Sequence, residues 1–348
     1  MQWGVSSSRA TPAFVLRPTS ITDVLRDTDN TLRAGGSAAA RVVPTGFGGL
    51  DTYLSGGLRA GELTLLGGPQ GLGKTAFALQ LARNVAASGG SVIYFSFEHD
   101  AATMLERLIA IEAGHLLGEE GVPVRRVRQA MEKSGSFHSL AERLAGTPGG
   151  PQAVGAVEGY GDRLFLHRAL GRRTDLDEIW SMARGLATDG TGADGTGPLV
   201  IVDYLQKVHV PDGGDEEERA AYVVEGLKDM ALDVGVPVLA IVASDKEGLA
   251  PGRRLRAHHM RGSSALAYEA DVVLLLNDKY DVVAKHHLVY DTTASQRYLN
   301  YVVLSIEKNR GGIDRVDLEM RKRFEQSRFE TDVTPVVEQL VDERLFTE

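Results

Sequence analysis

The stretch Gly68-Pro69-Gln70-Gly71-Leu72-Gly73-Lys74-Thr75 has the pattern G-x-x-x-x-G-K-T of a phosphate-binding loop. It lies between the apolar run Leu63–Leu66, which is typical of a buried strand, and the helical pattern Ala76–Ala87. The glycines let backbone N–H groups wrap a polyphosphate, Lys74 reaches the β- and γ-phosphates, and the Thr75 hydroxyl binds Mg²⁺. Because the motif has the strand-loop-helix setting that it requires, the sequence predicts a nucleoside triphosphate site rather than a chance glycine-rich turn.

The composition is that of a soluble globular protein, with 348 residues, 43% apolar and 24% charged. No apolar run approaches the roughly 18 residues of a membrane span, and the N-terminus lacks the order of a signal peptide, so we expect a cytoplasmic protein. The lack of cysteine excludes disulfides, thiol catalysis and cysteine-ligated zinc. We interpret the pairs His258-His259 and His286-His287 as solvated or loop residues. The metal that the sequence predicts is therefore nucleotide-bound Mg²⁺.

Apolar runs typical of strands alternate with helical patterns along most of the chain. The runs are Leu63–Leu66, Val92–Phe95, Leu164–His167, Leu199–Val202, Val236–Val242, Asp271–Leu276 and Tyr301–Ile306. Continuous apolar strands separated by helices predict an α/β fold with a mostly parallel sheet that is covered by helices on both faces. We interpret the glycine-rich stretches Gly114–Gly161 and Ala187–Gly197 as irregular connections or insertions.

The first forty residues are predicted to form a separate unit. A tail rich in Ser, Arg and Pro precedes a short helix, for which Ser20 is a suitable N-cap and Gly35-Gly36 a suitable end. Apolar residues from Ile21 to Leu32 lie on one side of this helix. A short helix with an apolar face between flexible segments needs a surface to pack against.

Two carboxylates follow strands next to the phosphate loop. Asp203 ends the run Leu199–Val202, where an acidic side chain reaches the water shell of the metal. Glu98 follows the run Val92–Phe95 and is the candidate for polarising the attacking water beside the γ-phosphate. The alternatives are that Asp203 is a turn or helix-cap residue and that Glu98 is an ordinary exposed glutamate. The presence of both carboxylates together with the phosphate loop favours the functional interpretation.

A strongly basic stretch follows the run Val236–Val242. The net charge of −9 argues against wrapping of nucleic acid by the whole surface, but it leaves room for a local basic loop. Between Lys246 and Arg261 the chain carries Arg253, Arg254 and Arg256. This loop leaves the carboxyl end of a predicted strand, where open α/β sheets bind ligands, so its arginines are candidates for nucleic-acid contacts. The alternative is a solvated surface loop.

Four further strings accompany the phosphate loop: Pro44-Thr45-Gly46-Phe47-Gly48-Gly49-Leu50-Asp51, Phe95-Ser96-Phe97-Glu98, Ile201-Val202-Asp203-Tyr204-Leu205-Gln206 and Glu307-Lys308-Asn309-Arg310. In this order they resemble the C-terminal, RecA-like motor domain of replicative DnaB-type helicases, over about residues 19–330. The resemblance implies a RecA-like P-loop NTPase that forms a ring, usually a hexamer, with ATP between subunits and single-stranded nucleic acid in the pore. It also implies that Thr19–Gly35 is a linker helix that docks on the next subunit.

The resemblance assigns roles and domains. It implies a tail and linker helix in residues 1–40 and a RecA-like ATPase domain in residues 41–348, with no counterpart of the family's N-terminal primase-interaction domain. Residues 68–75 match the Walker A element, Glu98 the catalytic glutamate and Asp203 the Walker B aspartate. Lys308 and Arg310 match the Lys-x-Arg element that the family projects into the neighbouring site, where a guanidinium neutralises phosphoryl charge. The alternative for them is a basic cluster at a strand end.

The nucleic-acid loop of the family contains an arginine ten residues before an aspartate that opens the next strand. Arg261 stands in this relation to Asp271 and is the best single candidate for a phosphate contact. The family has a glutamate after this arginine, whereas this chain has Gly262.

Two departures bear on function. The glutamine with which the family senses the γ-phosphate is replaced by Ala243, so either Ser244 or Asp245 substitutes for it or the coupling is altered. In addition, the chain carries an acidic run after Gln206: Asp212, Asp215, Glu216, Glu217 and Glu218. This run would repel nucleic acid if it faced the pore and would be harmless if it faced outward.

Two functions therefore remain open. The first is an Mg²⁺-dependent ATPase that acts as a helicase or translocase on single-stranded DNA, with a protein loader or regulator as a further partner. The second is an assembly or regulatory ATPase in which nucleotide controls oligomerisation or partner binding. Ala243, the acidic run and the lack of a primase-interaction domain favour the second, and the basic loop with Arg261 favours the first. A filament-forming recombinase fits the strings Pro44–Asp51 and Asp203–Gln206 less well.

Overall fold

The computed structural model describes residues 18–36, 39, 41–135, 137–189, 197–211, 213–245, 252–289 and 292–343. The chain divides into two units, residues 1–40 and 41–348, which are described separately. In the first unit, helix α1 (Ile21–Arg33) begins after Ser20, whose hydroxyl oxygen accepts a hydrogen bond from the Asp23 N–H at 3.1 Å. Its apolar residues, Ile21, Val24, Leu25 and Leu32, are exposed within this unit. No helix among the described residues is both long and apolar enough to cross a bilayer.

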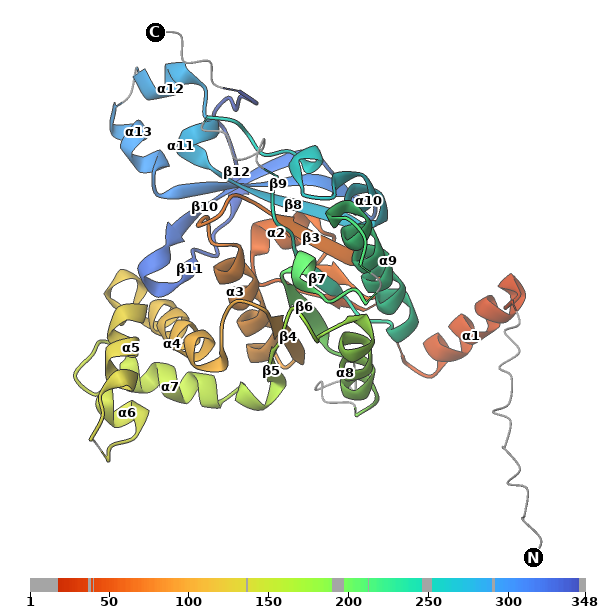
Figure 1. Ribbon diagram of the computed structural model, residues 1–348, viewed down its shortest axis with the longest axis horizontal. Helices are drawn as coiled ribbons and strands as arrows, with labels where there is room; N and C mark the ends of the chain where they lie inside the picture. Colours follow the sequence, from red (N-terminus) through yellow and green to blue (C-terminus); the bar gives the residue numbers. More distant parts are fainter. Residues whose placement is uncertain are drawn as a thin grey trace, which may run out of the picture. The chain divides into compact units, whose positions relative to one another are not determined.

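The second unit is built on a ten-stranded sheet (Figure 1). Its strand order is β11-β10-β9-β8-β3-β7-β6-β4-β5, with β12 paired to β10. The strands are β3 (Leu63–Gly67), β4 (Val92–Ser96), β5 (Leu164–Arg168), β6 (Leu199–Asp203), β7 (Val238–Ile241), β8 (Val272–Asp278), β9 (Tyr301–Asn309), β10 (Val316–Arg323), β11 (Arg328–Phe329) and β12 (Thr334–Pro335). Strands β8 to β5 of this order are parallel, and β9 to β12 add antiparallel pairs. The prediction of a mostly parallel sheet is confirmed.

Helices cover both faces of the sheet, as the continuous apolar strands predicted. One face packs against α2 (Gly48–Tyr53), α3 (Lys74–Ala87) and α4 (Ala101–Leu117), and the other against α8 (Leu176–Thr188), α9 (Glu216–Val234) and α10 (Ser263–Glu269). Side chains of each strand alternate between the two cores, so that Tyr94 belongs to the first and Phe95 to the second. Further elements are the antiparallel pair β1 (Val42–Val43) and β2 (Leu58–Arg59), and helices α11 (Lys279–Val282), α12 (Lys285–Val289) and α13 (Thr292–Tyr298).

Of the two interpretations of Gly114–Gly161, the irregular connection is wrong, and the insertion stays a prediction. This stretch contains the end of α4 and three further helices, α5 (Val124–Glu132), α6 (Leu140–Arg143) and α7 (Gly150–Glu158). These helices pack on α4 around a small core of their own, which includes Ile109, Val127, Leu144 and Ala153. Many of the glycines that suggested a loop mark helix ends, such as Gly118 with φ +62° and Gly149 with φ +70°. Of the second glycine-rich stretch, residues 190–196 lie outside the described residues.

The string Pro44–Asp51 attaches the start of the domain to helix α3. The Asp51 carboxylate accepts hydrogen bonds from the Thr45 N–H at 2.9 Å, the Thr45 hydroxyl at 2.7 Å and the Gly46 N–H at 3.1 Å. This turn places the Phe47 ring on the Phe77 ring of α3, with 4.6 Å between their centroids. The string therefore supports the helix that follows the phosphate loop.

We expect Asp51→Ala to destabilise the domain. The substitution leaves the donors of the buried residue Thr45 without their acceptor, and each buried donor left unpaired costs about 1–3 kcal/mol. Urea denaturation checks this as a lower free energy of unfolding. Asp314→Ala, on the exposed turn between β9 and β10, is the control, and equal unfolding midpoints for the two variants would contradict the role of Asp51.

Candidate nucleotide site

The phosphate loop leaves β3, which lies between β7 and β8 in the parallel part of the sheet, and reaches α3 at Lys74. Gly73 has φ +88°, and a Cβ at this position would lie 2.8 Å from ring atoms of Phe324 and Phe329. Both the backbone conformation and the space therefore require glycine. The loop and the N-terminus of α3 line a cavity of about 560 Å³, and a helix N-terminus favours a bound anion.

Lys74 lies with its ammonium group folded over the loop. Its Nζ donates hydrogen bonds to the carbonyl oxygens of Gly68, at 2.6 Å, and Pro69, at 3.0 Å. Burial lowers the pKa of Lys74, whereas the nearby carboxylates of Asp203 and Glu98 act in the opposite direction. A half-buried ammonium group that donates to backbone carbonyls is suited to bind an incoming phosphate.

The sheet brings the two predicted carboxylates to the same cavity. β4 and β6 are parallel neighbours, with Ser96 opposite Asp203, so that Glu98 and Asp203 both follow the carboxyl edge. Glu98 is exposed and lines the cavity, whereas the Asp203 side chain is buried, with 2% of the residue exposed. Burial raises the pKa of Asp203, and hydrogen bonds from the side chains of Tyr94 and Thr75 oppose this rise.

The residues present fit a nucleoside triphosphate with Mg²⁺. The Thr75 hydroxyl and the Asp203 carboxylate supply the oxygen ligands that Mg²⁺ prefers, directly or through its water shell. The left-handed glycine and the carbonyl-bound Lys74 ammonium fit the phosphates. These features put Lys74, Thr75, Glu98 and Asp203 around one cavity, as the sequence predicted.

The structure adds polar residues that the sequence did not single out. Arg107 and Arg128 line the cavity from α4 and α5, together with His99. The Arg107 guanidinium lies 3.1 Å from Nε2 of His99, and burial lowers the pKa of Arg107. No ion pair of Arg107 with a carboxylate is found within the described part of the chain. In sequence, Arg107 is one of several charged residues on an apolar helix, so only its half-buried position could have revealed it.

Ser244 takes a position close to the phosphate loop, while Ala243 joins two other elements. The Ser244 hydroxyl donates a hydrogen bond to the Gly68 carbonyl at 3.2 Å. The Ala243 N–H donates to Oε1 of Gln206 at 3.1 Å, and the Ala243 carbonyl accepts from the Arg261 N–H at 3.0 Å. Ser244, one of the two residues considered as substitutes for the family glutamine, thus has its side chain on the loop.

Lys308 and Arg310 lie away from the cavity of their own chain. Asn309, between them, pairs with Val272 at the start of β8, and β8 places this end beside the start of β3. The phosphate loop follows the opposite end of β3. The Lys308 ammonium contacts the carbonyls of Ala267 and Tyr268, and the Arg310 guanidinium donates to the Tyr268 carbonyl at 2.6 Å. Neither residue lines the cavity beside its own phosphate loop.

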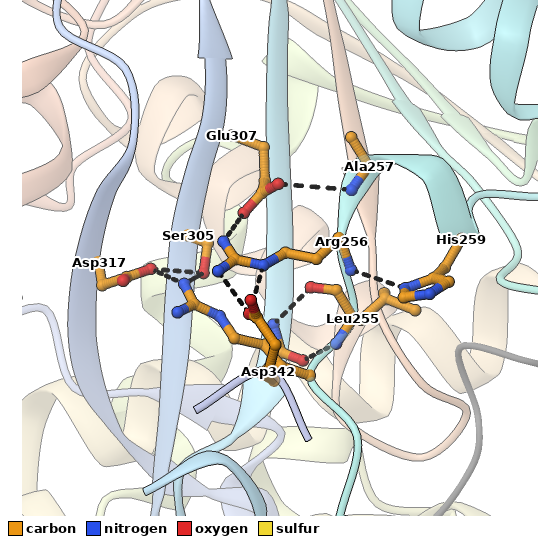
Figure 2. A network of polar contacts seen from close by, with 10 residues as sticks. Leu255, Arg256, Ala257, His259, Ser305, Glu307, Asp317 and Asp342 are labelled. Carbon is orange, nitrogen blue, oxygen red and sulfur yellow. Dashed lines mark hydrogen bonds and ion pairs between the residues drawn. The ribbon is translucent and has the colours of Figure 1, made fainter. Parts of the chain in front are cut away.

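Most of the predicted basic loop is engaged in contacts within the domain. The Arg254 side chain is buried, bonded to Ser305 at 3.0 Å and paired with Asp317. Figure 2 shows Arg256 between Glu307 and Asp342. Its guanidinium donates a hydrogen bond of 2.8 Å to a carboxylate oxygen of each. Arg254 and Arg256 therefore do not match the prediction of exposed phosphate contacts, because carboxylates from β9, β10 and the C-terminal segment hold them. The backbone of Arg253 pairs with Glu343, and residues 246–251 lie outside the described residues.

The pair His258-His259 lies in the same region, where His258 is exposed and His259 is buried. His259 is buried, with 3% of the residue exposed, and its Nδ1 accepts a hydrogen bond from the Arg256 N–H at 3.0 Å (Figure 2). It is therefore a structural residue of this loop rather than a solvated one. His286 and His287 lie on α12, where Nε2 of His287 accepts a hydrogen bond from the Gln339 N–H at 3.1 Å.

Arg261 remains exposed, but it meets the acidic run. Its guanidinium forms an ion pair of 2.9 Å with Glu216, and both side chains are 46% exposed. Ser264 donates a hydrogen bond of 3.0 Å to Glu217. The first turn of α9 thus faces the segment of Arg261, whereas Asp212 lies outside the described residues. In this arrangement the acidic run partly neutralises the candidate phosphate contact.

A family model described as DnaB-like helicase C-terminal domain matches residues 42–331. The replicative DNA helicase DnaB of Treponema pallidum is 25% identical over 327 residues, which cover 92% of this chain and 63% of that relative. The replicative DNA helicase DnaC of Bacillus subtilis is 25% identical over 289 residues, covering 81% of this chain and 55% of the relative. The chain thus spans less than two thirds of the length of these relatives.

Two solved structures share the fold. One, described as an ATPase domain, superposes with a TM-score of 0.68 at 22% identity, covering 90% of this chain and 99% of that one. A DnaB-like replicative helicase, described with its interactions with primase, superposes with a TM-score of 0.67 at 21% identity, covering 89% and 68%. The predicted RecA-like arrangement of the sheet and its helices is confirmed.

Proposed function

Since the chain belongs to the family of DnaB-like helicase C-terminal domains, we propose that it hydrolyses ATP with Mg²⁺ and couples hydrolysis to movement along single-stranded DNA. The observation that carries this proposal is the meeting of Lys74, Thr75, Glu98 and Asp203 around one cavity at the carboxyl edge of the sheet. These residue types are the ones that phosphoryl transfer to water requires.

Each residue has a role that follows from its position. Lys74 exchanges the carbonyls of Gly68 and Pro69 for the β- and γ-phosphates, and Thr75 and Asp203 hold the metal. Mg²⁺, when bound, offsets the negative charge of the phosphates. Glu98 accepts a hydrogen bond from the attacking water and orients it. Arg107, which has no carboxylate partner among the described residues, adds a positive charge beside the γ-phosphate.

The site needs a second subunit to be complete. Because Lys308 and Arg310 lie at the opposite edge of the sheet from their own loop, they serve a cavity only if it belongs to a neighbouring copy. The exposed apolar side of α1 gives residues 1–40 a means to dock on such a copy. Both features support a ring, with the hexamer of the family as the proposed state. The proposed location of this ring is the cytoplasm. A loader or regulator is a further proposed partner.

Arg261 is the proposed contact to DNA, and the structure offers a path from it to the nucleotide. Gln206, which follows β6 and Asp203, accepts from the Ala243 N–H and donates to the Arg261 carbonyl at 3.2 Å. Ser244, which follows Ala243 in the chain, donates a hydrogen bond to the phosphate loop. A change at the phosphates is thus passed by few bonds to the segment of Arg261, even though Ala243 has no polar side chain.

We expect Arg261→Glu to weaken binding of single-stranded oligothymidylate and to reduce the slope of log K against log salt by about one, because one phosphate contact is lost. Fluorescence anisotropy with the ATP-bound Glu98→Gln protein measures both. Lys133→Glu, at the exposed end of α5, is the control for net charge. Equal affinity and slope for Arg261→Glu and the parent would remove Arg261 from the track.

The second candidate function is an assembly or regulatory ATPase. The pairing of Arg261 with Glu216 favours it, because a carboxylate occupies the guanidinium that would bind DNA. Steady-state ATP hydrolysis with and without single-stranded DNA, at low and near-physiological salt, separates the two functions, with Glu98→Gln as the blank. Stimulation that fades with salt supports the motor, and hydrolysis indifferent to DNA supports the regulatory ATPase.

A further inference from the structure

Tyr94 is a fully buried tyrosine directly beneath the nucleotide site. It is the third residue of β4, in a strand whose residues are all buried, and its ring belongs to the core between the sheet and helices α3 and α4. Its hydroxyl donates a hydrogen bond to Oδ2 of Asp203 at 2.8 Å. In the register of β4 and β6, Tyr94 is opposite Ile201, two residues before the pair Ser96 and Asp203.

The hydroxyl has no evident use in packing. Phenylalanine would fill almost the same volume without placing a polar group in the core, and a buried hydroxyl without a partner costs free energy. In this chain the partner is the carboxylate at the end of the neighbouring strand. The hydroxyl and the carboxylate therefore satisfy each other, and the bond restricts rotation of the Asp203 carboxylate about its Cβ–Cγ bond.

The orientation of that carboxylate bears on the site. A carboxylate accepts hydrogen bonds at both oxygens, and the Tyr94 hydroxyl occupies one position on Oδ2. Asp203 also meets the side chain of Thr75, the other candidate metal residue. Groups that hold a metal-binding carboxylate in place typically change metal affinity or activity by about 10–100-fold when they are removed.

We infer that Tyr94 is a positioning residue, which fixes the Asp203 carboxylate so that its free acceptor positions face Thr75 and the water shell of the metal. This inference rests on the proposed use of Mg²⁺ and nucleotide. It concerns a residue that contacts neither the nucleotide nor the reacting atoms, because Tyr94 does not line the cavity.

The test is Tyr94→Phe, which removes the hydroxyl and keeps the ring. Binding of Mn²⁺ in the presence of ADP is titrated by electron paramagnetic resonance, and binding of a fluorescent ADP is measured in EDTA. We expect about tenfold weaker Mn²⁺ binding and unchanged metal-free ADP binding. Tyr160→Phe is the matched control, because Tyr160 is a second buried tyrosine, with 3% exposed, that does not line the cavity.

A double-mutant cycle with Asp203→Asn completes the test. If Tyr94 acts through Asp203, Tyr94→Phe has little further effect on Mn²⁺ binding once the carboxylate is gone. Mn²⁺ binding by Tyr94→Phe equal to that of the wild type, or equal losses in Tyr94→Phe and Tyr160→Phe, would overturn the inference alone. A wild-type protein that binds no Mn²⁺ with ADP would overturn the proposed function together with it.

Discussion

Glu98→Gln is expected to lower the steady-state rate of ATP hydrolysis by about 10²–10⁴-fold while ATP binding stays close to that of the wild type. Glutamine keeps the size of the side chain but cannot accept a proton from the attacking water. Lys74, Thr75 and Asp203, which are the proposed contacts to the phosphates and the metal, remain in place. Single-turnover hydrolysis and equilibrium binding of a fluorescent ATP analogue separate the two effects.

The matched control is Glu158→Gln, at the exposed C-terminal end of α7 and outside the cavity. It loses the same charge and is expected to hydrolyse ATP at the wild-type rate. A Glu98→Gln protein that keeps more than about a tenth of the wild-type rate contradicts the assignment, since a positioned base contributes at least about 10²-fold. Another cavity residue, such as His99, would then be the first alternative.

Arg310→Ala is expected to reduce hydrolysis by about 10³-fold or more, because an arginine supplied to the transferring phosphoryl group is worth about 10³–10⁵-fold. The distinctive result is expected from mixtures. Arg310→Ala subunits retain an intact phosphate loop, and Lys74→Ala subunits retain an intact arginine at the other edge of the sheet. An interface is complete where the Arg310→Ala subunit supplies the phosphate loop and the Lys74→Ala subunit supplies the arginine. Part of the activity is therefore restored.

The alternative for Arg310 is a structural role at the end of α10, where its guanidinium contacts Tyr268 and Asp271. Thermal unfolding distinguishes the two, because a purely structural arginine lowers the melting temperature and mixing does not rescue it. Lys133→Ala, on exposed surface at the end of α5, controls for loss of a positive charge. A mixture no more active than its two parts would argue against a site shared between subunits.

The sequence alone determined most strands of the sheet and the candidate residues of the nucleotide site. Buried strands are continuous apolar runs, so the parallel strands β3 to β8 and the antiparallel β9 were visible from hydrophobicity. The phosphate loop was visible because backbone geometry requires its glycines, whereas binding of phosphate and Mg²⁺ requires its lysine and threonine. Glu98 and Asp203 were predictable because parallel strands end at the same edge, so a carboxylate after each of two strands meets the other if the strands are neighbours.

Other features depended on contacts between distant segments. Many of the glycines in Gly114–Gly161 mark helix ends. The stretch is helical because its helices pack on α4 around a small core. Arg254 and Arg256 look like a solvated basic loop until β9, β10 and the C-terminal segment supply their carboxylates. Charge along the chain says nothing about which partner will lie opposite in space.

The tertiary structure also decided how the site is held and what it lacks. Only the register of β4 and β6 places the Tyr94 hydroxyl on Asp203, and only the position of α4 turns Arg107 toward the cavity. Lys308 and Arg310 were recognisable as a motif, but the antiparallel pairing of β8 with β9 sends them to the edge away from their own loop. Local patterns therefore indicated the candidate residues for chemical functions, and the pairing of strands decided which of them one chain can bring together.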